Sequence, residues 1–291
     1  MIGIIIVSYK SFEQTIKYVR NELTKVKAPH RTVVVNVGSD RASSDKLESE
    51  LGDLCHVLHS EENLGYARGN NLGADYLLKL YPEIDHLLFS NDDIEFLSDN
   101  VVEVLSQRLD EMPEVGCIGP KIFDLKDNLQ GPGYRRPAIG YYIRRNIGEP
   151  IFGSKRYWYE DNRPRIAEAV HIVSGCFHMV RVSSFKQVGG FDPRTFLYWE
   201  EEILSARLEK IGKKVYFEPS VAIRHYVGNT TSSAPNLLLL RSELFGQRLY
   251  FREYAKASFF MRFLLGASAK IRLFLVHLAC LKRACKRLLK K

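Results

Sequence analysis

An apolar run stops abruptly at three oxygen-bearing side chains in the stretch Leu87-Leu88-Phe89-Ser90-Asn91-Asp92-Asp93-Ile94-Glu95-Phe96. The apolar part predicts a buried strand, whose end would lie where a parallel sheet opens its ligand crevice. Neighbouring carboxylates repel each other, and Mg²⁺ or Mn²⁺ takes oxygen ligands that it usually shares with phosphates. A metal site is therefore one interpretation of Asn91-Asp92-Asp93. A solvated turn is the other, because Asn and Asp also favour turns.

Apolar runs on both sides of this stretch predict the rest of the fold. Strands are expected at 2–7, 32–37, 54–58, 86–90, 115–122, 168–181 and 214–223. Helices are expected at 12–27, 44–52 and 99–110, and two further helices are expected to end near residues 80 and 210. This alternation predicts an α/β fold with a mostly parallel sheet and helices on both faces. Residues 126–166 are rich in Gly, Pro, Arg and Tyr without clear periodicity, and we expect a long loop there.

Positive charge is concentrated at the C-terminal end. The 291 residues carry a net charge of +8, but residues 254–291 hold ten Lys and Arg and no acid, which leaves 32 basic against 34 acidic residues elsewhere. A nearly neutral body without a recognition motif argues against a nucleic-acid-binding protein. Five cysteines without paired metal-ligand spacing favour a reduced, cytoplasmic compartment.

From Leu237 onwards the pattern is helical, which divides the chain into a domain at 1–236 and a C-terminal helical extension at 237–291. Apolar residues recur there at helical spacing, while Arg262, Lys270 and Arg272 interrupt any span of about 20 apolar residues. This pattern predicts a basic amphipathic helix that lies on an anionic membrane. Packing on the body, or on a second subunit in a homodimer, are the alternatives.

Two further groups of residues fit a nucleotide. Ser8, Tyr9 and Asn36 follow strands that would lie beside the 86–90 strand, where nucleotides commonly bind. Asn63, Gly65 and Asn70 open a helix, and small or amide residues there let the backbone approach a base or ribose. An ordinary capped loop is the alternative for this second group.

Three adjacent acids, Glu200-Glu201-Glu202, follow an aromatic run at the expected start of a helix. The helix dipole stabilises acids at that position, which is a purely structural interpretation. A general base, with its pKa tuned by burial near aromatic rings, is the functional interpretation.

In this order, the motifs resemble those of the family 2 glycosyltransferases of the GT-A fold, especially the rhamnosyltransferase-like branch that builds bacterial surface polysaccharides. The resemblance covers roughly residues 2–233. Its motifs are Ile6-Val7-Ser8-Tyr9, Asn63-Leu64-Gly65-Tyr66-Ala67-Arg68-Gly69-Asn70-Asn71, Asn91-Asp92-Asp93, Gly119-Pro120-Lys121-Ile122, Gly189-Gly190-Phe191-Asp192, Phe196-Leu197-Tyr198-Trp199-Glu200-Glu201, and His225 with Gly228 and Ser232.

The resemblance implies a role for each matching residue. Asp93 would hold the Mg²⁺ or Mn²⁺ ion that bridges the nucleotide diphosphate, with Asp92 beside it and His225 as a further metal ligand. Glu201 would be the general base, with Glu200 next to it. The nucleotide pocket would include Ser8, Tyr9, Asn36, Asn63 and Gly65.

We therefore expect an inverting, metal-dependent transferase that uses a nucleotide-sugar donor and a saccharide or lipid-linked saccharide acceptor in surface polysaccharide biosynthesis. It would be cytoplasmic and peripheral on the inner face of the cell membrane. A non-catalytic nucleotide- or carbohydrate-binding relative is the alternative. Val35 and Glu201 stand where the family usually has Asp, and Ile203 stands where a second Asp often follows, so that Glu200 or Glu202 could also be the base.

Overall fold

The computed structural model describes residues 1–152, 166–226 and 237–288. Its strands are β1 (Ile2–Ser8), β2 (His30–Val37), β3 (His56–Ser60), β4 (His86–Ser90), β5 (Ile94–Phe96), β6 (Val115–Phe123), β7 (Glu168–Val170), β8 (Phe177–Arg181) and β9 (Lys214–His225). Its α-helices are α1 (Phe12–Asn21), α2 (Arg41–Leu51), α3 (Gly65–Leu80), α4 (Val101–Glu111), α5 (Ile139–Phe152), α6 (Val182–Val188), α7 (Glu200–Lys210), α8 (Leu237–Leu249) and α9 (Phe259–Leu288). A 3₁₀ turn (η1, Leu23–Lys25) follows α1, and a π-helical turn (η2, Tyr250–Tyr254) follows α8.

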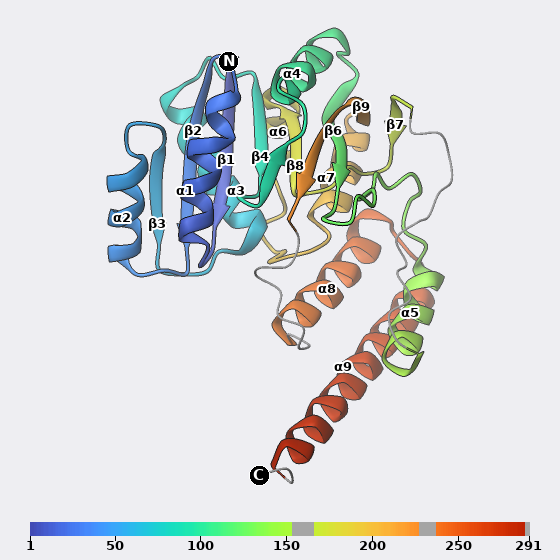
Figure 1. Ribbon diagram of the computed structural model, residues 1–291. Coiled ribbons are helices and arrows are strands. Elements are labelled where there is room, and N and C mark those ends of the chain that lie inside the picture. Colours follow the sequence, from blue (N-terminus) through green and yellow to red (C-terminus); the bar gives the residue numbers. More distant parts are fainter. Residues whose placement is uncertain (153–165, 227–236, 289–291) are drawn as a thin grey trace.

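One sheet organises the described residues, with the strand order β3-β2-β1-β4-β8-β6-β9-β5 and β7 paired to β9 (Figure 1). β1, β2, β3, β4, β6 and β9 run in one direction, and β5, β7 and β8 run in the other. The predicted mostly parallel α/β sheet is therefore confirmed. Because β8 is reversed, Phe177 at its start pairs with Ser90 at the end of β4. The beginning of β8 thus joins the sheet edge at which the parallel strands end.

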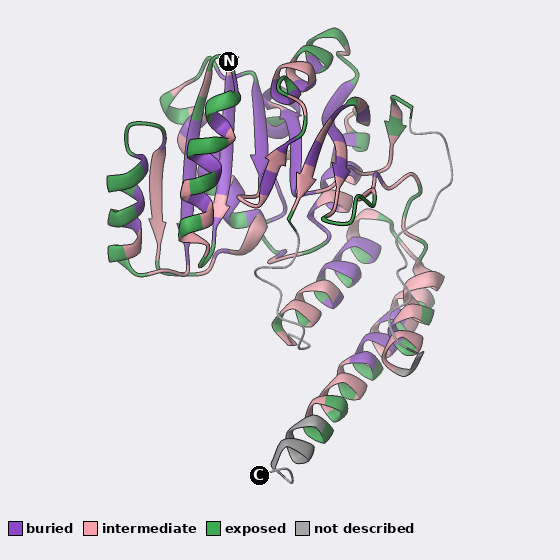
Figure 2. Cartoon of the chain, viewed as in Figure 1, coloured by how far each residue is buried: buried purple, intermediate pink, exposed green. Residues whose placement is uncertain are grey.

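Helices cover both faces of the sheet, as the alternating pattern predicts. Side chains from α1, α2 and α4 pack on one face around Ile4 and Ile6. Side chains from α3, α6 and α7 pack on the other face around Ile5, because successive residues of a strand point to opposite faces. Figure 2 shows the central strands buried between these layers.

Three local predictions were wrong. The expected loop at 126–166 contains the helix α5, whose Tyr142 and Ile143 pack with a separate apolar cluster that includes α9 residues. The single strand expected at 168–181 is split into β7 and β8, because the Gly175 backbone between them binds side chains instead of a neighbouring strand. β5 and α6 were not predicted.

The C-terminal helices leave the sheet as an arm in which α9 lies against α5 (Figure 1). Arg272 of α9 is buried and forms ion pairs with Glu149 of α5, at 2.7 Å, and Glu243 of α8, at 3.4 Å. Part of α9, Phe259–Lys282, is long and apolar enough to cross a membrane by length and composition. This stretch meets that criterion although it contains Arg262, Lys270 and Arg272, the three cations that were expected to interrupt such a span.

Candidate functional site

Asp93 and His225 face each other at the sheet edge where β4 and β9 end. The Asp93 Oδ1 atom lies 3.1 Å from His225 Nε2, and both side chains are mostly buried. The Tyr226 N–H donates to the Asp93 carbonyl at 2.9 Å, which fixes the two segments together. Gln130 Oε1 lies 3.0 Å from His225 Nδ1 and orients the ring. Burial lowers the pKa of His225, but Cys176 and the Asp93 carboxylate outweigh it and raise the pKa to about 10.

The Asp93–His225 pair fits a divalent cation. Asp93 Oδ1 is buried and lies 3.1 Å from His225 Nε2, so an oxygen with ligand capacity points at an imidazole nitrogen. Carboxylate oxygen and imidazole nitrogen are both ligands of Mn²⁺-type ions. Among the described residues no group of three or more His, Cys, Asp or Glu could hold a metal, so a cation here would need ligands from a bound phosphate or water.

Asp92 points away from this pair, towards the start of α1. Its Oδ2 atom accepts hydrogen bonds from Ser11 Oγ at 2.5 Å and Thr15 Oγ1 at 2.6 Å. Ser8 Oγ joins the same network 2.8 Å from Thr15 Oγ1. Burial raises the pKa of Asp92, and the two hydroxyl donors oppose that rise. Asp92 and Ser8 therefore tie β4, β1 and α1 together beneath the site.

A second part of the edge is lined by Tyr9, Gly38 and Asn63. Gly38 has φ +62°, and an added Cβ would lie 2.9 Å from the Tyr9 ring and 3.0 Å from Asn63. Only glycine therefore lets these two side chains close on the backbone. The Asn63 Oδ1 atom accepts from the Gly65 N–H at 3.1 Å, which sets the start of α3.

The amides of Asn36 and Asn70 are used inside the fold. Asn36 Nδ2 donates to Ser44 Oγ at 2.9 Å, and Asn70 Nδ2 donates to the Tyr66 carbonyl at 3.0 Å. Both side chains are buried. The structure thus brings Tyr9, Asn63 and Gly65 together at the surface of the edge and places Asn36 and Asn70 below it.

The three adjacent glutamates begin α7 after a strained turn. Tyr198 and Trp199 have φ +75° and +77°, a left-handed conformation that is unfavourable for side chains of this size. Burial raises the pKa of Glu201. Burial first, and the neighbouring Glu201 charge second, raise the pKa values of Glu200 and Glu202 to about 8.

Glu201 is the glutamate connected to the part of the edge that carries Asp93 and His225. Its Oε1 atom accepts the Gly175 N–H at 2.9 Å. The Tyr66 hydroxyl donates to the Gly175 carbonyl at 2.7 Å, and the Asn91 N–H donates to the carbonyl of the next residue, Cys176, at 2.8 Å. A single turn at 174–176 therefore holds Glu201 on one side and the Asn91-Asp92-Asp93 segment on the other.

Sequence reasoning missed the contributions of Gly175, Cys176 and Gln130. Gly175 was assigned to the interior of a strand, where glycine is unfavourable, and that residue type is the signal that marks the turn. An added Cβ on Gly175 would lie 2.1 Å from the Glu201 carboxylate. No comparable signal marks Gln130. Gly228 and Ser232, the last residues of the motif series, lie outside the described residues.

Comparisons with known proteins agree with the family that the motifs indicate. A family model described as glycosyl transferase family 2 matches residues 3–189. An N-acetylglucosaminyl-diphospho-decaprenol L-rhamnosyltransferase of Mycobacterium tuberculosis is 27% identical over 191 residues, which cover 62% of this chain and 61% of that protein. The low-salt glycan biosynthesis hexosyltransferase Agl10 of Haloferax volcanii is 28% identical over 203 residues, which cover 69% of this chain and 59% of that protein. The chain thus matches about three fifths of the length of each relative.

Among solved structures, the mannosyltransferase PcManGT of Pyrobaculum calidifontis, in complex with GDP-Man and Mn²⁺, superposes with a TM-score of 0.57 and 14% identity. The superposition covers 98% of this chain and 75% of that one. At this identity the likeness concerns the fold, and it confirms the GT-A fold that the motifs predict.

Proposed function

Because the chain belongs to glycosyl transferase family 2, we propose that it transfers a sugar from a nucleotide-sugar donor to a saccharide or lipid-linked saccharide acceptor, with inversion at the anomeric carbon. One observation supports this proposal most strongly. Asp93 and His225 contact each other at one edge of the sheet, and the turn at 174–176 connects this edge to Glu201. The names of two relatives, one referring to N-acetylglucosaminyl-diphospho-decaprenol and the other to glycan biosynthesis, support this proposal.

In the donor half of the reaction, Asp93 and His225 would hold Mg²⁺ or Mn²⁺ against the donor diphosphate. The cation would offset the negative charge that develops on the departing nucleoside diphosphate. Its binding requires a neutral imidazole, so His225 would lose its proton when the cation enters. Tyr9, Asn63 and Gly65 are placed to contact the nucleoside, with Ser8, Asn36, Asn70 and Asp92 supporting them from within.

In the acceptor half, Glu201 takes the proton of the attacking hydroxyl. The acceptor oxygen forms a bond to the anomeric carbon while the bond from that carbon to the diphosphate oxygen breaks, which inverts the configuration. The Gly175 N–H holds one oxygen of the Glu201 carboxyl in place. Burial raises the Glu201 pKa above its ordinary value, and a raised pKa strengthens the carboxylate as a proton acceptor. Glu200 and Glu202 lie next to Glu201 in the sequence, and either is the alternative base.

Nucleotide-sugar binding can be tested before the acceptor is known. A ligand that binds the native state raises the melting temperature, so purified protein is heated with a panel of nucleotide sugars with Mn²⁺ or with EDTA. We expect one donor to raise the melting temperature only with Mn²⁺, and the Asp93→Ala variant to lose that rise. That donor is then incubated with polyprenyl-diphosphate-linked saccharides. Binding without transfer to any of them would favour the non-catalytic alternative.

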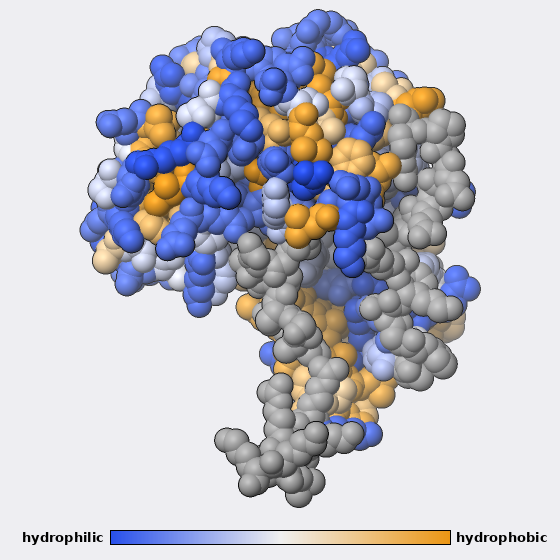
Figure 3. Space-filling view, viewed as in Figure 1, coloured by the Kyte–Doolittle hydropathy of each residue, from blue (hydrophilic) through white to orange (hydrophobic). Residues whose placement is uncertain are grey.

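The arm has a surface that would bind the anionic inner face of the cell membrane, where a lipid-linked acceptor would reside. Leu265, Ala269 and Arg272 mark the buried side of α9. Phe263 and Phe274 lie on the other side and are 63% and 67% exposed. Figure 3 shows hydrophobic side chains gathered on the arm. Besides the buried, ion-paired Arg272, residues 254–291 hold nine cations and no acid, which suits anionic lipid.

Vesicle co-sedimentation tests the membrane proposal. We expect the double variant Phe263→Ser/Phe274→Ser to lose binding to phosphatidylglycerol vesicles. The control, Leu125→Ser, removes another exposed apolar side chain, 60% exposed, from the loop after β6 and should bind normally. Unchanged vesicle binding together with a change from dimer to monomer would reject the membrane and assign this surface to a second subunit.

A further inference from the structure

Trp199, the residue immediately before the three glutamates, is held by the C-terminal helices and not by the sheet. It is buried in an apolar cluster with Leu249, Tyr250, Phe251 and Leu265, all from the extension. Its ring centroid lies 5.3 Å from that of Tyr250 and 5.8 Å from that of Phe251. The surroundings of the turn that carries the candidate base therefore come mainly from residues after 236.

Helix α8 approaches this turn through Gly246. A Cβ added to Gly246 would lie 2.8 Å from the Trp199 Cβ and 2.9 Å from its Cδ1. Such distances are far below van der Waals contact, so only glycine permits this packing. From the other side, the Tyr142 ring of α5 lies 4.9 Å from the Trp199 ring. Trp199 is thus enclosed between two helices of the arm.

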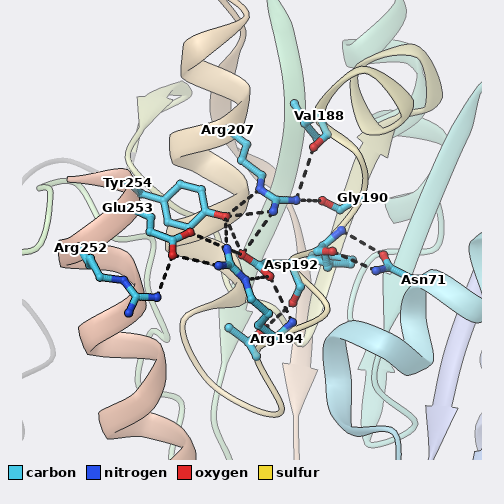
Figure 4. A network of polar contacts seen from close by, with 11 residues as sticks. Asn71, Val188, Gly190, Asp192, Arg194, Arg207, Arg252, Glu253 and Tyr254 are labelled. Carbon is cyan, nitrogen blue, oxygen red and sulfur yellow. Dashed lines mark hydrogen bonds and ion pairs between the residues drawn. The ribbon is translucent and has the colours of Figure 1, made fainter. Parts of the chain in front are cut away.

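A polar cluster fixes η2, the turn that follows α8, to α7 (Figure 4). Asp192 is buried and accepts the Tyr254 hydroxyl at 2.6 Å. Its carboxylate also pairs with Arg194 at 2.6 Å and with Arg207 of α7 at 3.3 Å. Arg207 donates to Tyr254 at 2.9 Å. The π-helical turn η2 is therefore bound to α7 and to the loop before it.

Left-handed backbone at two consecutive bulky residues is unfavourable and persists only where the surroundings impose it. At Trp199 the observed surroundings are the apolar cluster just described. We propose that Trp199 is a positioning residue through which the C-terminal helices set the orientation of Glu201 for acceptor attack. This inference rests on the proposed transfer reaction and makes the extension part of the machinery that orients the base.

The proposal predicts a kinetic separation. In a Gly246→Ala variant the added methyl group displaces Trp199, and a misplacement of about 1 Å lowers kcat by about 100-fold. Donor affinity, measured by titration with nucleotide sugar and Mn²⁺, should stay within about twofold, because Asp93 and Tyr9 lie on other elements. The acidic limb of the kcat profile should also move to lower pH, since a loosened turn hydrates Glu201.

The matched control is Gly266→Ala, because Gly266 is also helical and an added Cβ there meets nothing within 4 Å. Alanine favours a helix over glycine, so both variants gain a similar local stabilisation. Equal kcat values for the two variants would overturn the proposal. If Gly246→Ala does not fold, Tyr254→Phe replaces it, with Tyr81→Phe as a control that loses a hydrogen bond to His56.

A spectroscopic measurement separates this proposal from the proposed function. The sequence has two tryptophans, so a Trp158→Phe background leaves Trp199 as the sole tryptophan. We expect Gly246→Ala to shift the Trp199 emission to longer wavelength and increase its quenching by acrylamide, whereas Gly266→Ala leaves both unchanged. Unchanged emission in Gly246→Ala would overturn the proposal without any assay of transfer. A changed emission in a protein that transfers no sugar would instead reject the proposed reaction.

Discussion

Replacing Glu201 by Gln removes the proton acceptor while preserving the shape of the site. The Oε1 atom that accepts the Gly175 N–H at 2.9 Å has a counterpart in the Gln carbonyl, so the turn at 174–176 keeps its hydrogen bond. The substitution also removes one of three adjacent carboxylates, which relieves repulsion with Glu200 and Glu202. We therefore expect no loss of unfolding free energy and no change in donor affinity.

The magnitude follows from the role of the base. General-base catalysis contributes about 10²- to 10⁴-fold to a rate. Each tenfold change corresponds to about 1.4 kcal/mol, so Glu201→Gln should raise the transition-state free energy by about 3–5 kcal/mol. The assay is release of nucleoside diphosphate at saturating donor and acceptor, with donor affinity determined separately.

The pH dependence identifies the active form. Burial raises the Glu201 pKa above its ordinary value of 4.5, and the deprotonated carboxylate is the active form. The kcat of the wild type should therefore fall as pH decreases through that raised pKa, and the residual rate of Glu201→Gln should lack this step. A Glu201→Gln variant with wild-type kcat would refute the assignment, and loss of activity in Glu200→Gln alone would transfer it to Glu200.

Two further variants test the structure around the site. Gly65→Ala should lower the unfolding free energy by more than 2 kcal/mol, about the upper range for ordinary single substitutions, because its Cβ would lie 2.2 Å from the Phe196 carbonyl oxygen at φ +69°. Gly212→Ala at φ +74° has no neighbour within 4 Å, so chemical denaturation that gave equal losses for both would exclude the clash. Arg194 and Tyr254 hold the pKa of Asp192 well below 3.8 despite its burial, so its charge stabilises the native state above about pH 4 and that contribution is lost at lower pH. The stability difference between wild type and Asp192→Asn should therefore shrink on acidification, and a constant difference from pH 7 to pH 3 would contradict the ion pairs.

Periodicity predicted the sheet and its flanking helices because those elements bury alternating or helical apolar patterns. It failed at α5, where the Tyr142 contact to Trp199 is made with a partner more than fifty residues away. It also failed at the break between β7 and β8, because the Gly175 backbone binds side chains from α3 and α7. These contacts cannot be predicted from local sequence, because the partners are distant in the chain.

At the site, residue types predicted which side chains gather at the edge but not which way they point. Asp92 and Asp93 are adjacent in the same motif, yet Asp92 binds hydroxyls of α1 and Asp93 faces His225. The direction of each carboxylate depends on the register of β5 against β9, which pairs Ile94 with His225. That register is a property of the assembled sheet.

The proposed reaction centre is tested most directly by comparing the rates of sugar transfer by the Asp93→Asn variant and the wild type at saturating Mn²⁺. Asparagine keeps the size of the side chain and loses the charge that would bind the cation beside His225. We predict that the wild type attaches the donor sugar to a lipid-linked saccharide with inverted anomeric configuration, and that Asp93→Asn does so at least about 100-fold more slowly, as expected when a charged group that acts on the transition state is removed. Equal rates in the two proteins, or a product with retained configuration, would contradict a reaction centred on Asp93, His225 and Glu201.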